Sequence, residues 1–74
     1  MSADASKGRV RNRIRALRLA AGLSQQELAG RVGATRQTIN AIEQEKYSPS
    51  LELAFRIARS FDVGFEDVFQ FDAR

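Results

Sequence analysis

The sequence predicts an all-α domain built from five short helices. Apolar residues recur at intervals of three and four in several stretches, which is the spacing of one helix face. Ser24, Thr35 and Ser50 each precede such a stretch and are residue types that favour helix starts. No stretch alternates apolar and polar residues over five or more positions, so no strand is expected.

The first two helices are expected over about residues 9–21 and 25–32. The apolar face of the first consists of Val10, Ile14, Leu17 and Ala21. A capping box from Ser24 to Glu27 predicts the start of the second. Its apolar face consists of Leu28, Ala29 and Val32. Gly22 and Gly33 follow the two helices, where the chain must turn without a side chain.

Three further helices are expected. The third follows Thr35, and the fourth follows Ser50 after a loop over residues 45–49, because Pro49 disfavours helix at the preceding residue. A short fifth helix covers residues 65 to about 70. Apolar residues assigned to these helices are Ile39, Ile42, Leu51, Ala54, Phe55, Ile57, Ala58, Phe61, Phe65, Val68 and Phe69. Residues 1–8 are expected to form a disordered tail, 9–70 the domain, and 71–74 a C-terminal tail.

Composition limits the classes of function. The chain has 74 residues and contains neither cysteine nor histidine, so we expect one domain without disulfides, metal or cofactor. There is no glycine-rich phosphate loop or inward carboxylate cluster, and no enzyme is expected. No apolar run approaches the roughly 20 residues of a membrane span, and no signal peptide or effector-binding domain is evident, which predicts a cytoplasmic protein without a small-molecule effector.

Charge is distributed unevenly along the chain. Residues 1–46 contain nine basic and four acidic residues, whereas residues 47–74 contain three basic and five acidic ones. The balances are therefore +5 and −2, which sum to the net charge of +3. One basic half favours a surface that faces a polyanion, although net charge also serves solubility.

Residues 25–44, QQELAGRVGATRQTINAIEQ, have the pattern of two helices that cross at a large angle. Gly33 suits the turn between them, and Ala29 is small enough for a close helix contact. Apolar residues at fixed spacings complete the pattern: Leu28, Val32, Ala34, Ile39 and Ile42. This combination predicts a helix-turn-helix.

Over Leu23–Gln44 and Tyr47–Val63 the chain resembles the xenobiotic-response-element family of regulators, which includes the lambda and 434 repressors and Cro. The resemblance covers about residues 9–70. It implies a five-helix lambda-repressor-like DNA-binding domain that binds a double-stranded operator, an inverted repeat, as a homodimer. The expected function is therefore sequence-specific transcriptional regulation, with repression favoured over activation, at the bacterial nucleoid.

An α-helix fits the major groove of B-DNA, where its N-terminal residues meet base edges. The expected base-reading residues of the third helix are Arg36, Gln37, Thr38, Asn40 and Ala41. Arginine suits guanine, and glutamine or asparagine suits adenine, while Ala41 or the Thr38 methyl suits a thymine methyl. Solvation of an outer helix face is the alternative for each of them.

Five residues are expected to contact DNA phosphates. Gln25 and Gln26 begin the second helix, where free amides and the helix dipole favour an anion, and the resemblance implies phosphate contact for Gln25. The resemblance also places Lys46, Tyr47 and Ser48 in a phosphate-contacting loop, although Tyr47 could instead pack on that loop. Glu45 departs from the family, which has glycine or asparagine there; either the loop bends differently or Glu45 points away.

The resemblance further implies an ion pair between Arg18 and Glu43 that ties the first helix to the third. Phenylalanine is concentrated near the C-terminus, and a domain this small cannot easily bury five rings there. Phe55, Phe61 and Phe65 are expected in the core. The predicted dimer surface consists of Phe65, Val68, Phe69 and Phe71, with folding back of Phe71 as the alternative.

Two other classes of function compete with the homodimeric regulator. The first is an antitoxin that neutralises a partner protein, although the tails outside residues 9–70 are short for a toxin-wrapping segment. The second is an adaptor that no longer binds DNA, although such a protein would be expected to have lost the polar donors Arg36, Gln37 and Asn40. The operator sequence, the regulated genes and the organism are not determined by the residues.

Overall fold

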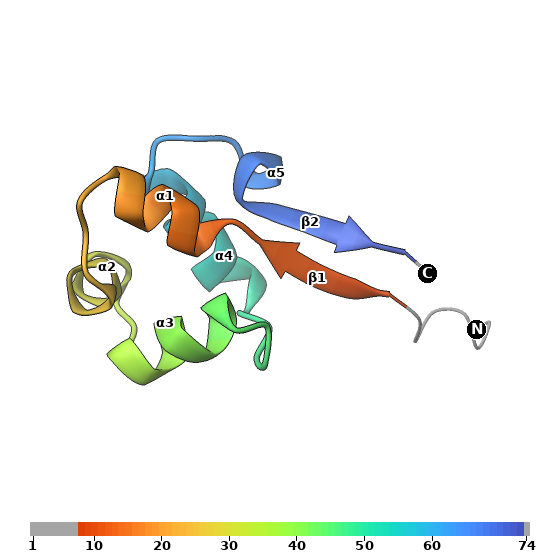
Figure 1. Cartoon of the computed structure of the whole chain (residues 1–74), viewed down its shortest axis with the longest axis horizontal. Coiled ribbons are helices and arrows are strands. Elements are labelled where there is room, and N and C mark those ends of the chain that lie inside the picture. Colours follow the sequence, from red (N-terminus) through yellow and green to blue (C-terminus); the bar gives the residue numbers. More distant parts are fainter. Residues whose placement is uncertain (1–7, 74) are drawn as a thin grey trace.

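The computed structural model describes residues 8–73 and shows five helices together with a two-stranded sheet (Figure 1). The elements are β1 (Arg9–Asn12), α1 (Ile14–Ala20), α2 (Gln25–Val32), α3 (Arg36–Glu43), α4 (Leu51–Ser60), α5 (Phe65–Val68) and β2 (Phe69–Asp72). Residues 1–7 of the predicted tail lie outside the described residues.

The helix starts follow the residues that precede them. Ser24 Oγ accepts a hydrogen bond from the backbone N–H of Glu27 at 3.0 Å, and the Glu27 carboxylate accepts one from the N–H of Ser24 at 2.8 Å. This is the predicted capping box. Thr35 and Ser50 cap α3 and α4 in the simpler way, through one side-chain oxygen each.

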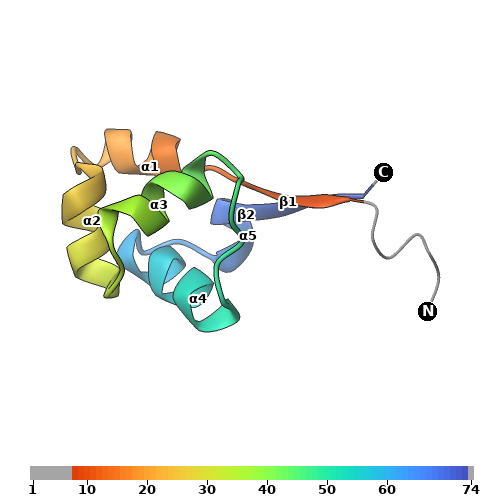
Figure 2. The same ribbon diagram turned by 90° about the horizontal axis from the view of Figure 1, so that it is seen from below.

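The five helices enclose one apolar core. Its buried members are Ile14, Leu28, Ala29, Val32, Ile39, Ile42, Ala54, Ile57, Ala58, Val68 and Phe69. Every helix contributes to this set, and the predicted inward faces of α2 and α3 are confirmed. In α4, Ala54, Ile57 and Ala58 are buried as predicted, but Leu51, assigned to the same apolar set, is 68% exposed. The core thereby holds α3 along one side of the body, where its outer face remains open (Figures 1 and 2).

The first helix begins later than expected, because residues 9–12 form β1. Asn12 ends the strand: its Oδ1 accepts a hydrogen bond from the N–H of Ile14 at 3.1 Å, and its Nδ2 donates to the carbonyl of Ile42 at 2.8 Å. An asparagine that engages neighbouring backbone groups competes with helix formation. Val10, assigned to a helix face, instead lies on the strand and is exposed.

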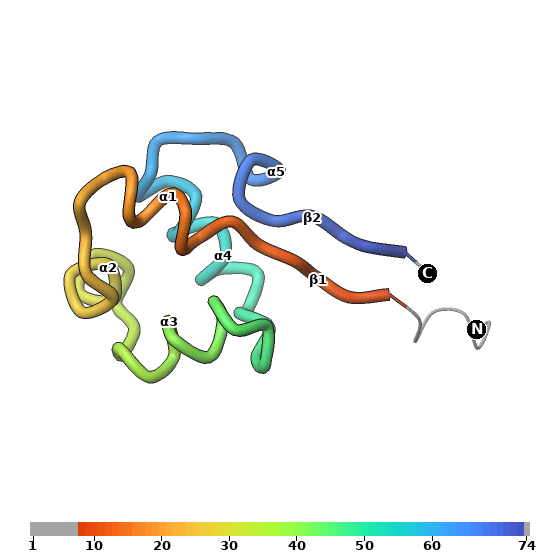
Figure 3. The backbone as a smooth tube through the Cα atoms, viewed as in Figure 1, coloured from red at the N-terminus to blue at the C-terminus, as the bar shows by residue number. Residues whose placement is uncertain are grey.

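The fifth helix is also shorter than predicted, since it ends at Val68 and β2 follows directly. The two strands pair antiparallel, with Arg9 opposite Asp72 and Asn12 opposite Phe69. They form a narrow ribbon that extends from the helical body, as the backbone trace shows (Figure 3). Residues 71 and 72 are thus part of a strand rather than of a C-terminal tail.

The phenylalanines are not distributed between the core and the surface as predicted. Phe69 is buried and Val68 is fully enclosed, so these two side chains belong to the core and are not left for a partner. Phe55, predicted in the core, is 49% exposed. Its ring packs on Phe65 with centroids 4.9 Å apart, and Phe65 packs on Phe69 at 5.1 Å. This row of rings connects α4, α5 and β2.

Candidate nucleic-acid interface

The turn between α2 and α3 depends on Gly33. Its φ is +74°, in the left-handed region that side chains disfavour. The N–H of Gly33 donates to the carbonyl of Ala29, and the N–H of Ala34 donates to the same carbonyl at 2.9 Å. Two helices are therefore joined by three residues, and this short connection sets the direction of α3.

The two faces of α3 have opposite characters. Ile39 and Ile42 are at most 1% exposed and anchor the helix to the core. Arg36 and Gln37 are exposed in its first turn, whereas Thr38, Asn40 and Ala41 are half-buried. All five predicted base-reading residues therefore lie away from the buried face, although only the first two are fully open to solvent.

Arg18 and Glu43 form a bidentate ion pair between α1 and α3. Nε donates to Oε2 at 2.7 Å and Nη2 donates to Oε1 at 3.0 Å, while Nη1 donates to the carbonyl of Leu23 at 3.0 Å. The side chains are only 10% and 5% exposed. Hydrogen bonding to Glu43 raises the pKa of the Arg18 guanidinium, so this guanidinium keeps its charge.

Gln25 extends this network to the outer part of α3, a role that sequence reasoning missed. Its Nε2 donates to Oδ1 of Asn40 at 3.1 Å and to Oε1 of Glu43 at 3.2 Å. A primary amide has two N–H donors, so both are occupied within the protein. The side chain of Gln25 therefore orients α3 residues instead of facing outward, and no local sequence signal links positions 15 and 18 residues apart.

The N-terminus of α2 nevertheless retains free backbone donors. Ser24 and Glu27 satisfy each other's N–H groups. Among the described residues, the N–H groups of Gln25 and Gln26 make no hydrogen bond. Unpaired amides at the positive end of a helix suit an anion such as a phosphate oxygen.

The loop after α3 resolves the question about Glu45. Its φ is +61°, so the glutamate takes the left-handed geometry. Its carboxylate lies 3.3 Å from the guanidinium of Arg9 on β1 and is thus directed at the ribbon. Lys46, Tyr47 and Ser48 are exposed on the same loop. The side chain of Tyr47 is 52% exposed.

A polar hollow of about 340 Å³ lies where α1, α2 and α3 meet. It is lined by Arg15, Arg18, Gln25, Asn40, Glu43 and Gln44. Arg15 is exposed and is the one cation of this lining that the Glu43 carboxylate does not pair. It adds positive charge beside the start of α2, and sequence reasoning did not distinguish it from the other arginines of residues 9–18.

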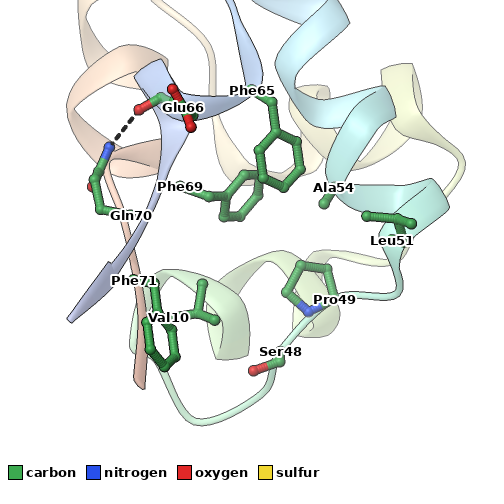
Figure 4. A pocket seen from close by; sticks show the side chains of 10 residues that line it. All are labelled: Val10, Ser48, Pro49, Leu51, Ala54, Phe65, Glu66, Phe69, Gln70 and Phe71. Atoms are coloured by element: carbon green, nitrogen blue, oxygen red, sulfur yellow. Dashed lines mark hydrogen bonds between the residues drawn. The ribbon is translucent and has the colours of Figure 1, made fainter. Parts of the chain in front are cut away.

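An apolar groove of about 400 Å³ lies between the ribbon and α4 (Figure 4). Val10 and Phe71 form the ribbon side, and Pro49 and Leu51 lie across from them (Figure 4). Phe71 is 63% exposed and Leu51 is 68% exposed. Of the predicted dimer residues, Phe71 is open and Phe65 is half-buried, whereas Val68 and Phe69 are covered by their own chain.

Residues 8–73 were compared with the requirements of a membrane span and of a metal site. Within this range no helix is long and apolar enough to cross a membrane. The same residues hold no group of three acidic, cysteine or histidine side chains arranged to bind a metal ion.

Comparison with known proteins identifies the class of domain. A helix-turn-helix family model matches residues 14–68. The chain is 55% identical over 64 residues to a protein of Methanothermobacter thermautotrophicus, which covers 85% of this chain and 93% of that relative. It is 51% identical over 63 residues to one of Archaeoglobus fulgidus, with 85% and 90% covered. Both relatives are named as uncharacterized HTH-type transcriptional regulators.

A bacterial relative and a solved structure agree with this assignment. The Bacillus subtilis HTH-type transcriptional regulator YgzD, also uncharacterized, is 47% identical over 60 residues, covering 81% of this chain and 91% of YgzD. The crystal structure of a candidate DNA-binding protein from Bacteroides fragilis superposes with a TM-score of 0.74 at 23% identity, over 82% of this chain and 98% of that one. The latter shows that the fold is shared.

Proposed function

Because the chain belongs to the helix-turn-helix family, we propose that it is a DNA-binding transcriptional regulator that represses by occupying an operator as a homodimer. The observation that carries this proposal is the two-faced α3, which is anchored by Ile39 and Ile42 and presents Arg36 and Gln37 outward. The names of the relatives support the same class of function. The role requires no catalytic residue or cofactor and places the protein in the cytoplasm.

In this proposal α3 enters the major groove of the operator. Arg36 donates two hydrogen bonds to guanine, and Gln37 pairs with adenine. Thr38 and Ala41 offer methyl groups to thymine, and Asn40 completes the polar part of the helix surface. A good bidentate contact discriminates between bases by about 1–3 kcal/mol, so Arg36 and Gln37 supply most of the specificity.

Phosphate contacts flank the reading helix on both sides. The free N–H groups of Gln25 and Gln26 bind one phosphate at the start of α2. On the other side, Lys46, Tyr47 and Ser48 bind a second through exposed donors. Contacts of this kind fix the position of the protein on the duplex and carry no direct sequence information.

A second copy of the chain is the proposed occupant of the apolar groove. A two-fold interface uses the same patch on both partners, and Val10, Leu51 and Phe71 supply exposed apolar surface for it. The ribbon lies beside the loop that follows α3, because Arg9 on β1 contacts Glu45 in that loop. In the proposed dimer, the two copies of α3 enter successive major grooves about 34 Å apart.

The decisive experiment is a selection of bound fragments from the source genome at near-physiological salt. The natural protein is compared with the variant R36A/Q37A, and circular dichroism verifies that both are folded. We expect the natural protein to enrich an inverted repeat with half-sites about ten base pairs apart and the variant to lose it. Sedimentation of the natural protein and of Phe71→Asp tests the dimer, which the variant is expected to lose.

The opposite outcomes would redirect the proposal. If both proteins bound DNA equally well, and only at low salt, the binding would be a nonspecific attraction to the phosphates. In that case a protein partner, as for an antitoxin or an adaptor, would become the leading explanation. Enrichment of a single half-site by a monomer would preserve DNA binding and reject the homodimer.

A further inference from the structure

A polar network on α3 consists of Arg18, Glu43, Gln25 and Asn40. The ion pair in this network determines which atom donates and which accepts in each of its hydrogen bonds. Arg18 carries only donors, so the Glu43 carboxylate accepts from it. An ionised carboxylate can only accept hydrogen bonds. The atom of Gln25 that lies 3.2 Å from it must therefore be the nitrogen of the NH₂ group. The negative charge of Glu43 therefore determines which end of the Gln25 amide, the oxygen or the nitrogen, faces the carboxylate.

The same logic orients Asn40. Because the NH₂ group of Gln25 faces it at 3.1 Å, the atom of Asn40 at that contact must be the carbonyl oxygen. Nε2 of Gln44 donates to this oxygen as well, at 3.3 Å. A carbonyl oxygen has two lone pairs, and both are occupied. The NH₂ group of Asn40 makes no hydrogen bond among the described residues and remains for a ligand.

We propose that Arg18, Glu43 and Gln25 hold Asn40 so that it presents donors alone to the DNA, and that Asn40 therefore selects guanine or thymine. This inference rests on the proposed DNA-binding function and makes it more specific. Guanine offers the acceptors N7 and O6 in the major groove, and thymine offers O4. Adenine also offers the acceptor N7, but beside it the N6 amino group donates, so the two-bond pairing of asparagine with adenine needs an accepting oxygen as well as a donor; cytosine offers only a donor.

The network distinguishes Asn40 from an asparagine on a free surface. An unrestrained side-chain amide pairs with adenine through both its atoms. Here acceptance from adenine N6 would require the carbonyl oxygen to release Gln25 and Gln44, and would leave Gln25 with one unpaired donor beside Glu43. Gln25 is consequently a positioning residue, and Asn40 is the residue that touches the base.

Selection from a library of random operators tests this inference, with the natural protein, Asn40→Ala and Gln25→Met compared. The base pair whose preference disappears in Asn40→Ala is the one that Asn40 contacts. In the natural protein we expect guanine or thymine there, by about tenfold over adenine. Gln25→Met keeps the side-chain length and removes the donors, so we expect a shift towards adenine. Gln26→Met, the same change one residue along, is expected to leave the base preference unchanged even where it lowers the affinity.

Side-chain amide spectra of the free protein test the network without DNA. We expect the Gln25 NH₂ protons to exchange with water more slowly than those of exposed Gln37, and to lose this protection in Glu43→Gln. Equal exchange of Gln25 and Gln37 would overturn the inference, as would adenine or cytosine at the base pair that Asn40→Ala affects. If no position changes in Asn40→Ala while R36A/Q37A abolishes binding, the inference fails and the proposed function stands. Absence of any specific binding would reject both.

Discussion

The helix-turn-helix and the ribbon are held to the body by different kinds of interaction. The ion pair of Arg18 and Glu43 attaches α3 to α1, and Gln25 links the same carboxylate to Asn40. In contrast, backbone pairing joins β1 to β2. The ion pair of Arg9 with Glu45 lies at the surface, where the Arg9 side chain is 68% exposed. The comparison shows that one region depends on particular charged side chains and the other mainly on backbone geometry.

The largest effect is expected from Glu43→Ala. The substitution leaves the Arg18 guanidinium buried without its partner and releases one donor of Gln25, and loss of one member of a buried pair costs about 3–5 kcal/mol. Urea denaturation measures the change in unfolding free energy. Glu52→Ala is the control, because Glu52 forms an exposed pair with Arg56 that contributes about 0.5 kcal/mol or less. Similar losses in the two variants would contradict this account.

In the ribbon, the comparable substitution is Gly8→Ala. A Cβ at Gly8 would lie 2.6 Å from Cζ of Phe71 and 2.9 Å from the carbonyl oxygen of Asp72, at a φ of +116°. Strain of this kind costs about 1–3 kcal/mol. Hydrogen exchange is expected to lose its protection in β1 and β2, while the amides of α3 keep theirs. Equal loss of protection in the two regions would show that they unfold together.

Gly33→Ala disturbs the helix-turn-helix through its backbone. A left-handed residue with a Cβ costs about 1–2 kcal/mol, and the φ of Gly33 is +74°. Thermal unfolding is expected to show this loss together with weaker operator binding, because the direction of α3 changes. An unchanged melting temperature would mean that the turn tolerates another geometry.

The matched substitution is Gly30→Ala, three residues earlier in α2. Gly30 has an ordinary helical φ, and a Cβ there meets nothing within 4 Å. Alanine is preferred over glycine inside a helix by about 1 kcal/mol, so this variant is expected to be more stable than the natural protein. The same change of residue thus has opposite signs at two nearby positions.

The smallest effect concerns pH. Hydrogen bonding from the backbone N–H of Ser24, and then from its side chain, lowers the pKa of Glu27 below its ordinary value of 4.5. A group with a lowered folded-state pKa stabilises the fold above the unfolded-state value and loses that contribution as the pH falls below it. We expect Glu27→Gln to flatten the decline in stability below about pH 4.5. An identical decline in both proteins would assign it to other carboxylates.

The sequence predicted the helical part of the fold well because its signals are local. A capping residue and its partner lie three positions apart, as Ser24 and Glu27 show, and one helix face repeats within a few residues. The strands were missed because each has only four residues. Phe69–Asp72 does alternate apolar and polar residues, but over too short a stretch to be distinguished from the end of a helix.

Some features of the candidate site were likewise predictable from local sequence signals, and others were not. The exposure of Arg36 and Gln37 followed from the helix period, and the pair of Arg18 and Glu43 was expected from family resemblance. The role of Gln25 was not predictable, since its partners are distant in sequence and become neighbours only after α2 and α3 cross. Burial of Val68 and Phe69 was likewise not predictable, because both side chains pack in the core against residues that are distant along the chain.

By itself, therefore, the sequence determined where the helices of the helix-turn-helix start, which of their faces are apolar, and which side chains α3 presents. Those properties depend on residues within about one or two turns of each other. Only the tertiary structure decided the pairing of the ribbon, the apolar groove beside it, and the orientation of Asn40 by Gln25. Each of these joins segments that are distant along the chain, and chain collapse around the common core brings such segments together.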